Sequence, residues 1–164
     1  MKILLSIFCL VLLVSCSNEV PSYKLVERDG VVYEVNSTTP FTGTMVSYDE
    51  GKLWFKNYYK EGKQDGPQVE YGWEGQVVFK GNYKDGKPDG LHQSYHYNGQ
   101  LRYKHNYKDG VQDGLSEEYH DNGQLWIKGN YKDGYKDGLW KEYHDNGQLE
   151  SKGNYKDGKQ EDGP

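Results

Sequence analysis

Short runs of alternating apolar and polar residues, separated by glycine-containing turns, fill most of this chain. Strict alternation is typical of β-strands that turn one face to the protein and the other to solvent. The clearest example lies between Asp113 and Lys136. One face of this hairpin is predicted to carry Leu115, Glu117 and Tyr119 from the first run and Leu125, Ile127, Gly129 and Tyr131 from the return. No stretch after Val14 escapes glycine or other turn residues long enough for a three-turn apolar stripe, so the pattern predicts an all-β fold.

Turn residues occur at both ends of every predicted strand. Asn122-Gly123 separates the two runs, and Asn-Gly is a strong hairpin signal because both residues tolerate positive φ. Asp133-Gly134 and Asp137-Gly138 connect one hairpin to the next, and Asp-Gly suits the same kind of turn. The predicted path is therefore a continuous antiparallel ribbon of hairpins.

The pattern repeats every 24 residues, and three sets of positions keep this period without a slip. They are Gly51, Gly75, Gly99, Gly123 and Gly147; Tyr59, Tyr83, Tyr107, Tyr131 and Tyr155; and Gly62, Gly86, Gly110, Gly134 and Gly158. Modules that stack mainly on their neighbours produce such a period. We predict five modules from Phe41 to Gln160 in one elongated antiparallel sheet, about 10 Å per module and about 50 Å in all.

The ends of the chain depart from the repeat. Residues 24–40 are predicted to form an N-terminal capping hairpin around Asp29-Gly30, and residues 16–23 a short polar tether. Residues 41–164 then hold the five repeats and a terminal cap, in which Pro164 would discourage edge pairing.

Residues 1–15 have the features of an export signal, with Lys2 before an apolar run that ends at Val14. The run is too short to span a bilayer as a helix. Leu13-Val14-Ser15-Cys16 resembles a bacterial lipobox, which implies lipidation of Cys16 and a stable anchor in the cell envelope. The alternative is an ordinary cleaved signal. Ser17 resembles the pattern that sends lipoproteins to the outer membrane of a Gram-negative host.

Composition narrows the functional classes. Cys9 would leave with the signal and Cys16 would be acylated, so disulfides and thiolate metal sites are excluded from the mature chain. Without Lys2 the 20 basic and 25 acidic residues leave a net charge of 19 minus 25, or −6. Nucleic acid is not expected as a partner, because its binding depends on basic surface.

The recurring YKDGKxDG followed by xxxYxxNGQL resembles the bacterial variant of the MORN repeat, over about 120 residues of this chain. The opening Pro40-Phe41-Thr42-Gly43 and the DNGQLxxKGNYKDG core resemble the YwqK family of toxin–antitoxin system antitoxins. That resemblance implies binding and neutralising a toxic protein partner. An export signal, however, departs from a cytoplasmic antitoxin.

Two repeated sets of polar residues invite a metal hypothesis. His96, His120 and His144 are equivalent, but modules about 10 Å apart cannot share one zinc ion, so solvated histidines are expected. Asp133 and Asp137 lack the spacing of a calcium loop, so turn formation explains them. We expect no metal and no cofactor.

Positions that break the repeat indicate where a partner would bind. The residue after the leucine of the return strand is Trp54, Val78, Arg102, Trp126 or Glu150, and alternation turns it away from the face carrying leucine and tyrosine. Trp126, Tyr135 and Trp140 fall at the junction of the last two modules, and exposed tryptophans are typical of binding hot spots. The alternative is that these rings cover the sheet or pack on one another.

No unique acid–base pair and no G-x-S-x-G elbow occurs, so we do not expect an enzyme. The predicted function is a lipid-anchored scaffold that binds a protein partner, in its sharpest form a toxin or effector. The alternative is a structural envelope protein that binds lipid head groups or glycan.

Overall fold

The computed structural model describes residues 18–161. The N-terminal elements are β1 (Glu19–Pro21), the 3-10 turn η1 (Ser22–Lys24), β2 (Leu25–Arg28) and β3 (Val31–Glu34). The repeats form β4 (Gly43–Asp49), β5 (Lys52–Lys60), β6 (Lys63–Tyr71), β7 (Val77–Lys84), β8 (Lys87–Pro88), β9 (Gly90–Tyr95), β10 (Leu101–Lys108), β11 (Val111–Tyr119), β12 (Leu125–Lys132), β13 (Tyr135–Tyr143), β14 (Leu149–Lys156) and β15 (Lys159–Gln160).

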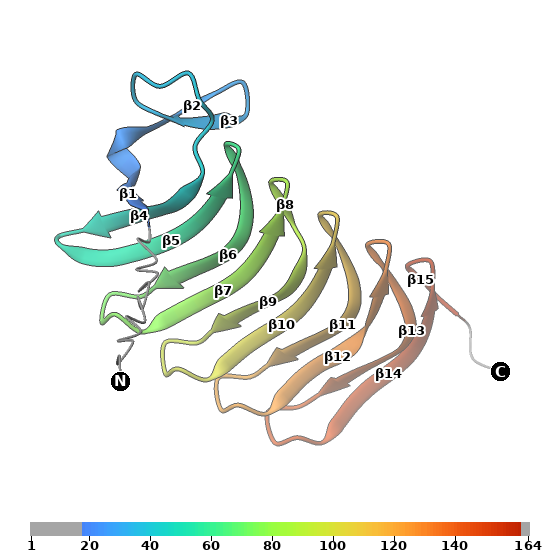
Figure 1. The fold of residues 1–164 in the computed structure, drawn as a ribbon. Helices are drawn as coiled ribbons and strands as arrows, with labels where there is room; N and C mark the ends of the chain where they lie inside the picture. Colours follow the sequence, from blue (N-terminus) through green and yellow to red (C-terminus); the bar gives the residue numbers. More distant parts are fainter. Residues whose placement is uncertain (1–17, 162–164) are drawn as a thin grey trace, which may run out of the picture.

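Thirteen of these strands form one open, twisted sheet whose spatial order follows the chain (Figure 1). From β4 onward each strand pairs antiparallel with the next, as a ribbon of hairpins requires, except that the short β8 pairs with β7, which also pairs with β9. The predicted all-β fold, a single elongated sheet of stacked hairpins, is confirmed. In the part of the chain that the structure describes, no helix is long and apolar enough to cross a membrane.

The hairpin turns lie along two opposite margins of the sheet and differ in geometry. On the Asp-Gly margin, exemplified by Asp133-Gly134, both residues have positive φ, 50° and 86°. On the Asn-Gly margin only the glycine does: Gly123 has a φ of 82°, and its N–H donates to the carbonyl of His120 at 2.9 Å. This is a three-residue loop with a left-handed glycine. The hairpin at Asn122 forms, but the prediction of positive φ for Asn122 is wrong.

Strand register corrects the predicted faces. Ser116 lies opposite Gly129, and Glu117 lies opposite Lys128. Directly opposite residues share a face, so Gly129 and Tyr131 lie on the side of Ser116, not on that of Leu115 and Glu117. The prediction failed because the return strand contains a β-bulge near its start, which shifts the alternation by one residue.

We call the side that carries Tyr83, Tyr107, Tyr131 and Tyr155 the aromatic face, and the side that carries Lys104 and Lys128 the lysine face. A row of paired positions crosses the aromatic face, running through Gln68, Gly81, His92, His105, Ser116, Gly129, Trp140 and Gly153. Large and small residues are neighbours in this row: His92 lies against Gly81 and Trp140 against Gly129. Both rings are buried, with 4% and 5% of their surface exposed. The thin sheet therefore obtains a core from size complementarity within one row.

The first edge of the sheet is closed differently from the prediction. Glu19–Pro21 forms β1, which pairs in parallel with β4 and buries Val20 to 7% exposure. The predicted tether is therefore wrong for these residues, because they complete the backbone pairing of the edge strand. A hairpin does form around Asp29-Gly30, from β2 and β3. It lies at the turn between β5 and β6, where the Val32 N–H donates to the Gly62 carbonyl at 2.8 Å (Figure 1).

Candidate functional site

A second row on the aromatic face contains the main departure from the repeat. Its paired members are Phe55, Glu70, Phe79, Ser94, Tyr103, Glu118, Ile127, Glu142 and Ser151. The equivalent hairpins carry Glu70, Glu118 and Glu142 at this place in the row. Ser94 takes that place between Phe79 and Tyr103, and its short side chain leaves a space between the two rings.

This space opens into a hollow of 520 Å³, lined by Ser94, Phe79 and Tyr103 together with Trp54, Trp73 and Arg102. Trp54 and Arg102 occupy the bulge position of their strands. A β-bulge re-aims side chains, and here it turns these two residues toward the aromatic rings. The prediction that this position points away from that face is wrong for Trp54 and Arg102, which line the same hollow as Phe79.

Two tryptophans form the outer wall of the hollow. The rings of Trp54 and Trp73 meet edge to face with centroids 6.5 Å apart, and 42% and 54% of their surface stays exposed. Lys52 fixes Trp73 from the side: its Nζ donates to the Trp73 carbonyl at 3.1 Å and lies 5.2 Å from the ring centroid. Tyr97 projects from the next turn with 95% of its surface exposed. Such a wall offers apolar area that the sheet itself does not cover.

Few polar groups line the hollow. The Ser94 hydroxyl donates to the Val78 carbonyl at 3.2 Å, so it is already bonded within the sheet. Burial raises the pKa of the Tyr103 hydroxyl above its ordinary value. Tyr103 also stacks on His105, with centroids 4.3 Å apart. The hollow is thus mainly apolar, with Glu70 and Arg102 as the charged residues of its lining.

The structure does not bring together the other predicted hot-spot residues. Trp126 lies near the Asn-Gly margin, 42% exposed and 5.8 Å from the ring of His120. Tyr135 lies at the Asp-Gly margin, at the far end of its hairpin, and is 61% exposed. The expectation that Trp140 is exposed is wrong. Its Nε1 donates to the Asn130 carbonyl at 3.1 Å, and the ring stands edge to face on Tyr131.

The repeated histidines connect neighbouring modules. His96 Nε2 donates to the Tyr119 carbonyl at 3.0 Å, and His120 Nε2 to the Tyr143 carbonyl at 2.9 Å. Both side chains are partly buried, so the expectation of solvated rings is wrong for them. His144, in the last module, instead lies 3.6 Å from the carboxylate of Glu150. The His96 and His120 side chains therefore connect neighbouring hairpins along the Asn-Gly margin.

The turn aspartates have a similar structural role. Asp133 N–H donates to the Asp113 carboxylate at 3.2 Å, and the two preceding modules repeat the contact. Between residues 18 and 161 no group of three histidine, cysteine, aspartate or glutamate residues could hold a metal ion. Cys16, the predicted lipidation site, lies outside the described residues.

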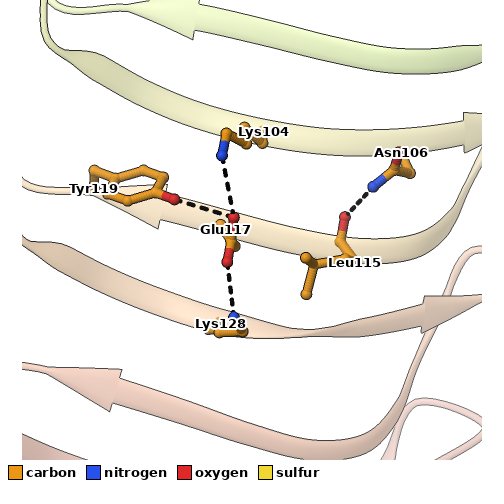
Figure 2. Close-up of polar contacts among 6 residues, drawn as sticks. All are labelled: Lys104, Asn106, Leu115, Glu117, Tyr119 and Lys128. Carbon is orange, nitrogen blue, oxygen red and sulfur yellow. Dashed lines mark hydrogen bonds and ion pairs between the residues drawn. The ribbon is translucent and has the colours of Figure 1, made fainter.

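The lysine face carries one buried carboxylate. Glu117, 9% exposed, lies between Lys128 at 2.9 Å and Lys104 at 3.6 Å, and accepts a hydrogen bond from the Tyr119 hydroxyl at 3.0 Å (Figure 2). The Lys128 ammonium lowers the pKa of Glu117, and Glu117 in turn raises that of Lys128. Burial and the Glu117 carboxylate raise the pKa of Tyr119 to about 12. This cluster shows how the sheet holds a carboxylate between two lysines.

Sequence reasoning missed Ser94 and Trp73. The signal for Ser94 was the glutamate at the equivalent place of three other hairpins. For Trp73 it was the Gly72-Trp73 pair, which stands where the later turns have His96-Tyr97 and His120-Asp121. Both signals are departures from the period, and they gain meaning only once the register shows that the two residues meet.

Three consecutive segments of the chain match the family described as MORN repeat variant: residues 88–109, 112–133 and 136–157. They correspond to the hairpins β9–β10, β11–β12 and β13–β14, each with its Asn-Gly turn. Three consecutive hairpins of the repeated sheet are therefore similar to the MORN repeat variant. No curated protein matches it significantly, and the resemblance to YwqK-type antitoxins stays a prediction.

Proposed function

We propose that this scaffold of MORN repeat variants is a non-enzymatic binding protein that takes a protein partner at the hollow walled by Trp54 and Trp73. The observation that supports it is the hollow itself, an apolar space with exposed tryptophans, a tyrosine and an arginine around it. Tryptophan, tyrosine and arginine dominate the energetic hot spots of protein interfaces. Ser94 and Trp73 depart from the repeat here, so the surface at the hollow differs from the equivalent places of the other hairpins.

The partner would contribute an apolar side chain. Ser94, Phe79 and Tyr103 form the floor, and a ring or a branched aliphatic group inserted there would cover the exposed area of both tryptophans. Arg102 and Glu70 would orient polar groups at the edge. Burial of such an anchor is worth about 1.5–3 kcal/mol, before the costs of association.

The proposed location is the cell envelope. Lipidated Cys16 would precede Glu19, the first residue of β1, by three residues, and an extended chain covers about 10 Å over that length. The first edge of the sheet would then lie close to the bilayer, and the hollow would lie further along the sheet, on β5, β6, β7, β9 and β10. In a Gram-negative host the membrane would be the outer one.

Neutralisation of a toxin or effector is the sharpest form of this proposal, and the resemblance to antitoxins supports it. A rigid sheet that occludes the working surface of a toxic protein needs no chemistry of its own. The repeated carboxylates and histidines already have structural partners within the sheet, which favours binding over catalysis.

A glycan is the second candidate, favoured by the exposed aromatic rings of Trp54, Trp73 and Tyr97. Sugars stack on such faces. A glycan would contact the outer wall and would not need the floor of the hollow, which separates the two hypotheses experimentally.

The test is site-specific photo-cross-linking in intact cells with a photoreactive amino acid at Tyr97, in wild-type protein and in Ser94→Glu. Glutamate is native at the equivalent positions Glu70, Glu118 and Glu142, so this substitution fills the hollow with a side chain that the repeat already accommodates. A cross-linker at Tyr135, on the other margin, is the control for position.

The proposal expects one protein cross-linked from Tyr97, lost in Ser94→Glu and absent from Tyr135. Cross-linking that persists unchanged in Ser94→Glu would show that the hollow is not the site. A change in the fluorescence of Trp54 and Trp73 on addition of soluble glycan, equal in wild type and in Ser94→Glu, would favour the second candidate.

A further inference from the structure

One row of paired positions crosses the lysine face and runs through Val46, Lys56, Val69, Lys80, Gln93, Lys104, Glu117, Lys128, Lys141 and Lys152. Lysine recurs on every return strand of this row. The residue between two such lysines differs from hairpin to hairpin, and its identity decides the local charge.

In the third of these intervals the intervening residue is Glu117. Its carboxylate lies 2.9 Å from Lys128 and 3.6 Å from Lys104, and Tyr119 donates a hydrogen bond to it (Figure 2). The sheet itself thus shows which chemistry fits between two lysines of the row: a carboxylate with a tyrosine hydroxyl beside it.

In the next interval the intervening residue is Lys141, which lies opposite Lys128 on one side and Lys152 on the other. Three ammonium groups therefore extend from neighbouring strands about 4.8 Å apart. Like charges directly opposite one another destabilise a sheet. Within residues 18–161, Glu117 is the partner of Lys128, and no carboxylate forms an ion pair with Lys141 or Lys152.

Tyr143 completes the likeness. It stands two residues after Lys141, as Tyr119 stands two residues after Glu117. Its charge interaction with Lys128 contributes to the raised pKa of that lysine, after the larger effect of Glu117. The interval thus has the lysines and the tyrosine of the Glu117 cluster, with a third lysine where the carboxylate would be.

We propose that Lys128, Lys141 and Lys152 form a binding site for an acidic side chain of a protein partner, which supplies from outside the carboxylate that Glu117 supplies within the sheet. We choose an acidic side chain because of charge complementarity: between Lys104 and Lys128 of the same row, the residue that the sheet itself supplies is the carboxylate of Glu117. Strand alternation puts the site on the face opposite Trp140 and Gly129, and so opposite the hollow. It does not depend on the hollow being a binding site.

The test uses the folded protein and a hexaglutamate peptide, with hexaglutamine as the neutral control peptide. Binding is followed by NMR titration of the backbone amides of β12–β14. The decisive variant is Lys141→Glu, which copies the Glu117 arrangement. Lys80→Glu is its matched control, because it makes the same change of charge in the same row between the neutral Val69 and Gln93.

We expect hexaglutamate to bind wild type with shifts confined to the three strands, and to release at 1 M salt, where charge interactions are screened beyond about 3 Å. Lys141→Glu should weaken binding at least tenfold and Lys80→Glu less than twofold. Lys141→Glu should also unfold at higher urea than wild type, which shows that its loss of binding is not loss of fold.

Equal weakening by both substitutions would overturn the proposal in favour of a net-charge effect, and so would absence of hexaglutamate binding to wild type. A third arm presents vesicles of phosphatidylglycerol in phosphatidylcholine. Vesicle binding that depends on Lys141, without peptide binding, would replace the acidic protein by an anionic lipid surface. Cross-linking at Tyr97, repeated in Lys141→Glu, tests the hollow separately.

Discussion

The indole of Trp140 lies directly across the backbone of Gly129, in the space that a side chain at Gly129 would occupy. The two residues lie on neighbouring strands, and the tryptophan is 5% exposed although the sheet has no second layer over it. Tyr131 and Tyr155 stand edge to face on the ring, with centroids 5.0 Å and 6.4 Å away. Glycine is required here for close approach.

Gly129→Ala should therefore destabilise the protein by about 2–3 kcal/mol, since overpacking forces the ring or the backbone to move. Gly153→Ala is the matched control: it lies at the equivalent position, and its methyl group would meet the flexible end of Gln160 at 3.0 Å. Urea denaturation of both variants measures the difference. Equal losses in the two would contradict the role assigned to Trp140.

Trp140→Ala should cost about 3–5 kcal/mol, the range for a buried aromatic residue cut to alanine. Trp126→Ala should cost less than about 1 kcal/mol, because Trp126 is 42% exposed and contacts mainly His120. Thermal and urea unfolding of the two variants test this order. A larger loss for Trp126→Ala would mean that Trp126, and not the packing of Trp140 on Gly129, holds the last modules together.

Glu117 should make stability depend on pH in the acid range. Its pKa in the folded protein lies below the ordinary value, so its contribution is complete above the unfolded pKa of about 4.3 and is lost as pH falls through the folded pKa. The free energy of unfolding should thus fall between pH 5 and pH 3 more steeply in wild type than in Glu117→Gln. Parallel pH profiles for the two proteins would show that the cluster adds no linked stability.

The same cluster should respond in the alkaline range with the opposite sign. Tyr119 has its pKa raised to about 12, so its contribution is complete below the unfolded value of about 10 and is lost as pH rises toward 12. Spectrophotometric titration of tyrosinate should show a tyrosine that titrates near pH 12 in wild type. Its absence in Tyr119→Phe identifies the residue, and its persistence there would assign it elsewhere.

His120→Ala should lower stability by about 1 kcal/mol, because it leaves the Tyr143 carbonyl without its donor. His144→Ala is the control from the last module, where the ring contacts Glu150 at 3.6 Å instead of a backbone carbonyl. Its effect should be within about 0.5 kcal/mol of zero. Hydrogen exchange of the amides in the two Asn-Gly turns would locate the loss, and equal effects would contradict the connecting role of His120.

Much of the fold was predictable from the chain because its determinants are local. Alternation in each run predicts a strand, and the pair Asp133-Gly134 forms a two-residue turn because both residues adopt positive φ. The predicted single elongated sheet forms because that hairpin is repeated along the chain. The turn at Asn122 formed with different geometry, since the loop there has three residues and only Gly123 needs the left-handed region.

The candidate site was less predictable, and Trp140 and Ser94 show why. Trp140 has the composition of a hot spot, but its burial depends on Gly129, eleven positions back along the chain and next to it in space. Ser94 reads as an ordinary polar strand residue. Its importance comes from Phe79 and Tyr103, which register places on either side of it.

The period, the strands, the turn positions and the open antiparallel order follow from the amino-acid sequence, because each depends on residues within a few positions of one another. The face that each side chain takes depends on the pairing of strands in space, because alternation has a period of two and one bulge residue reverses it. The tertiary structure also decided that Glu19–Pro21 closes the sheet and that Trp54, Trp73 and Ser94 share a hollow. These outcomes depend on pairing between strands, which a linear pattern does not contain.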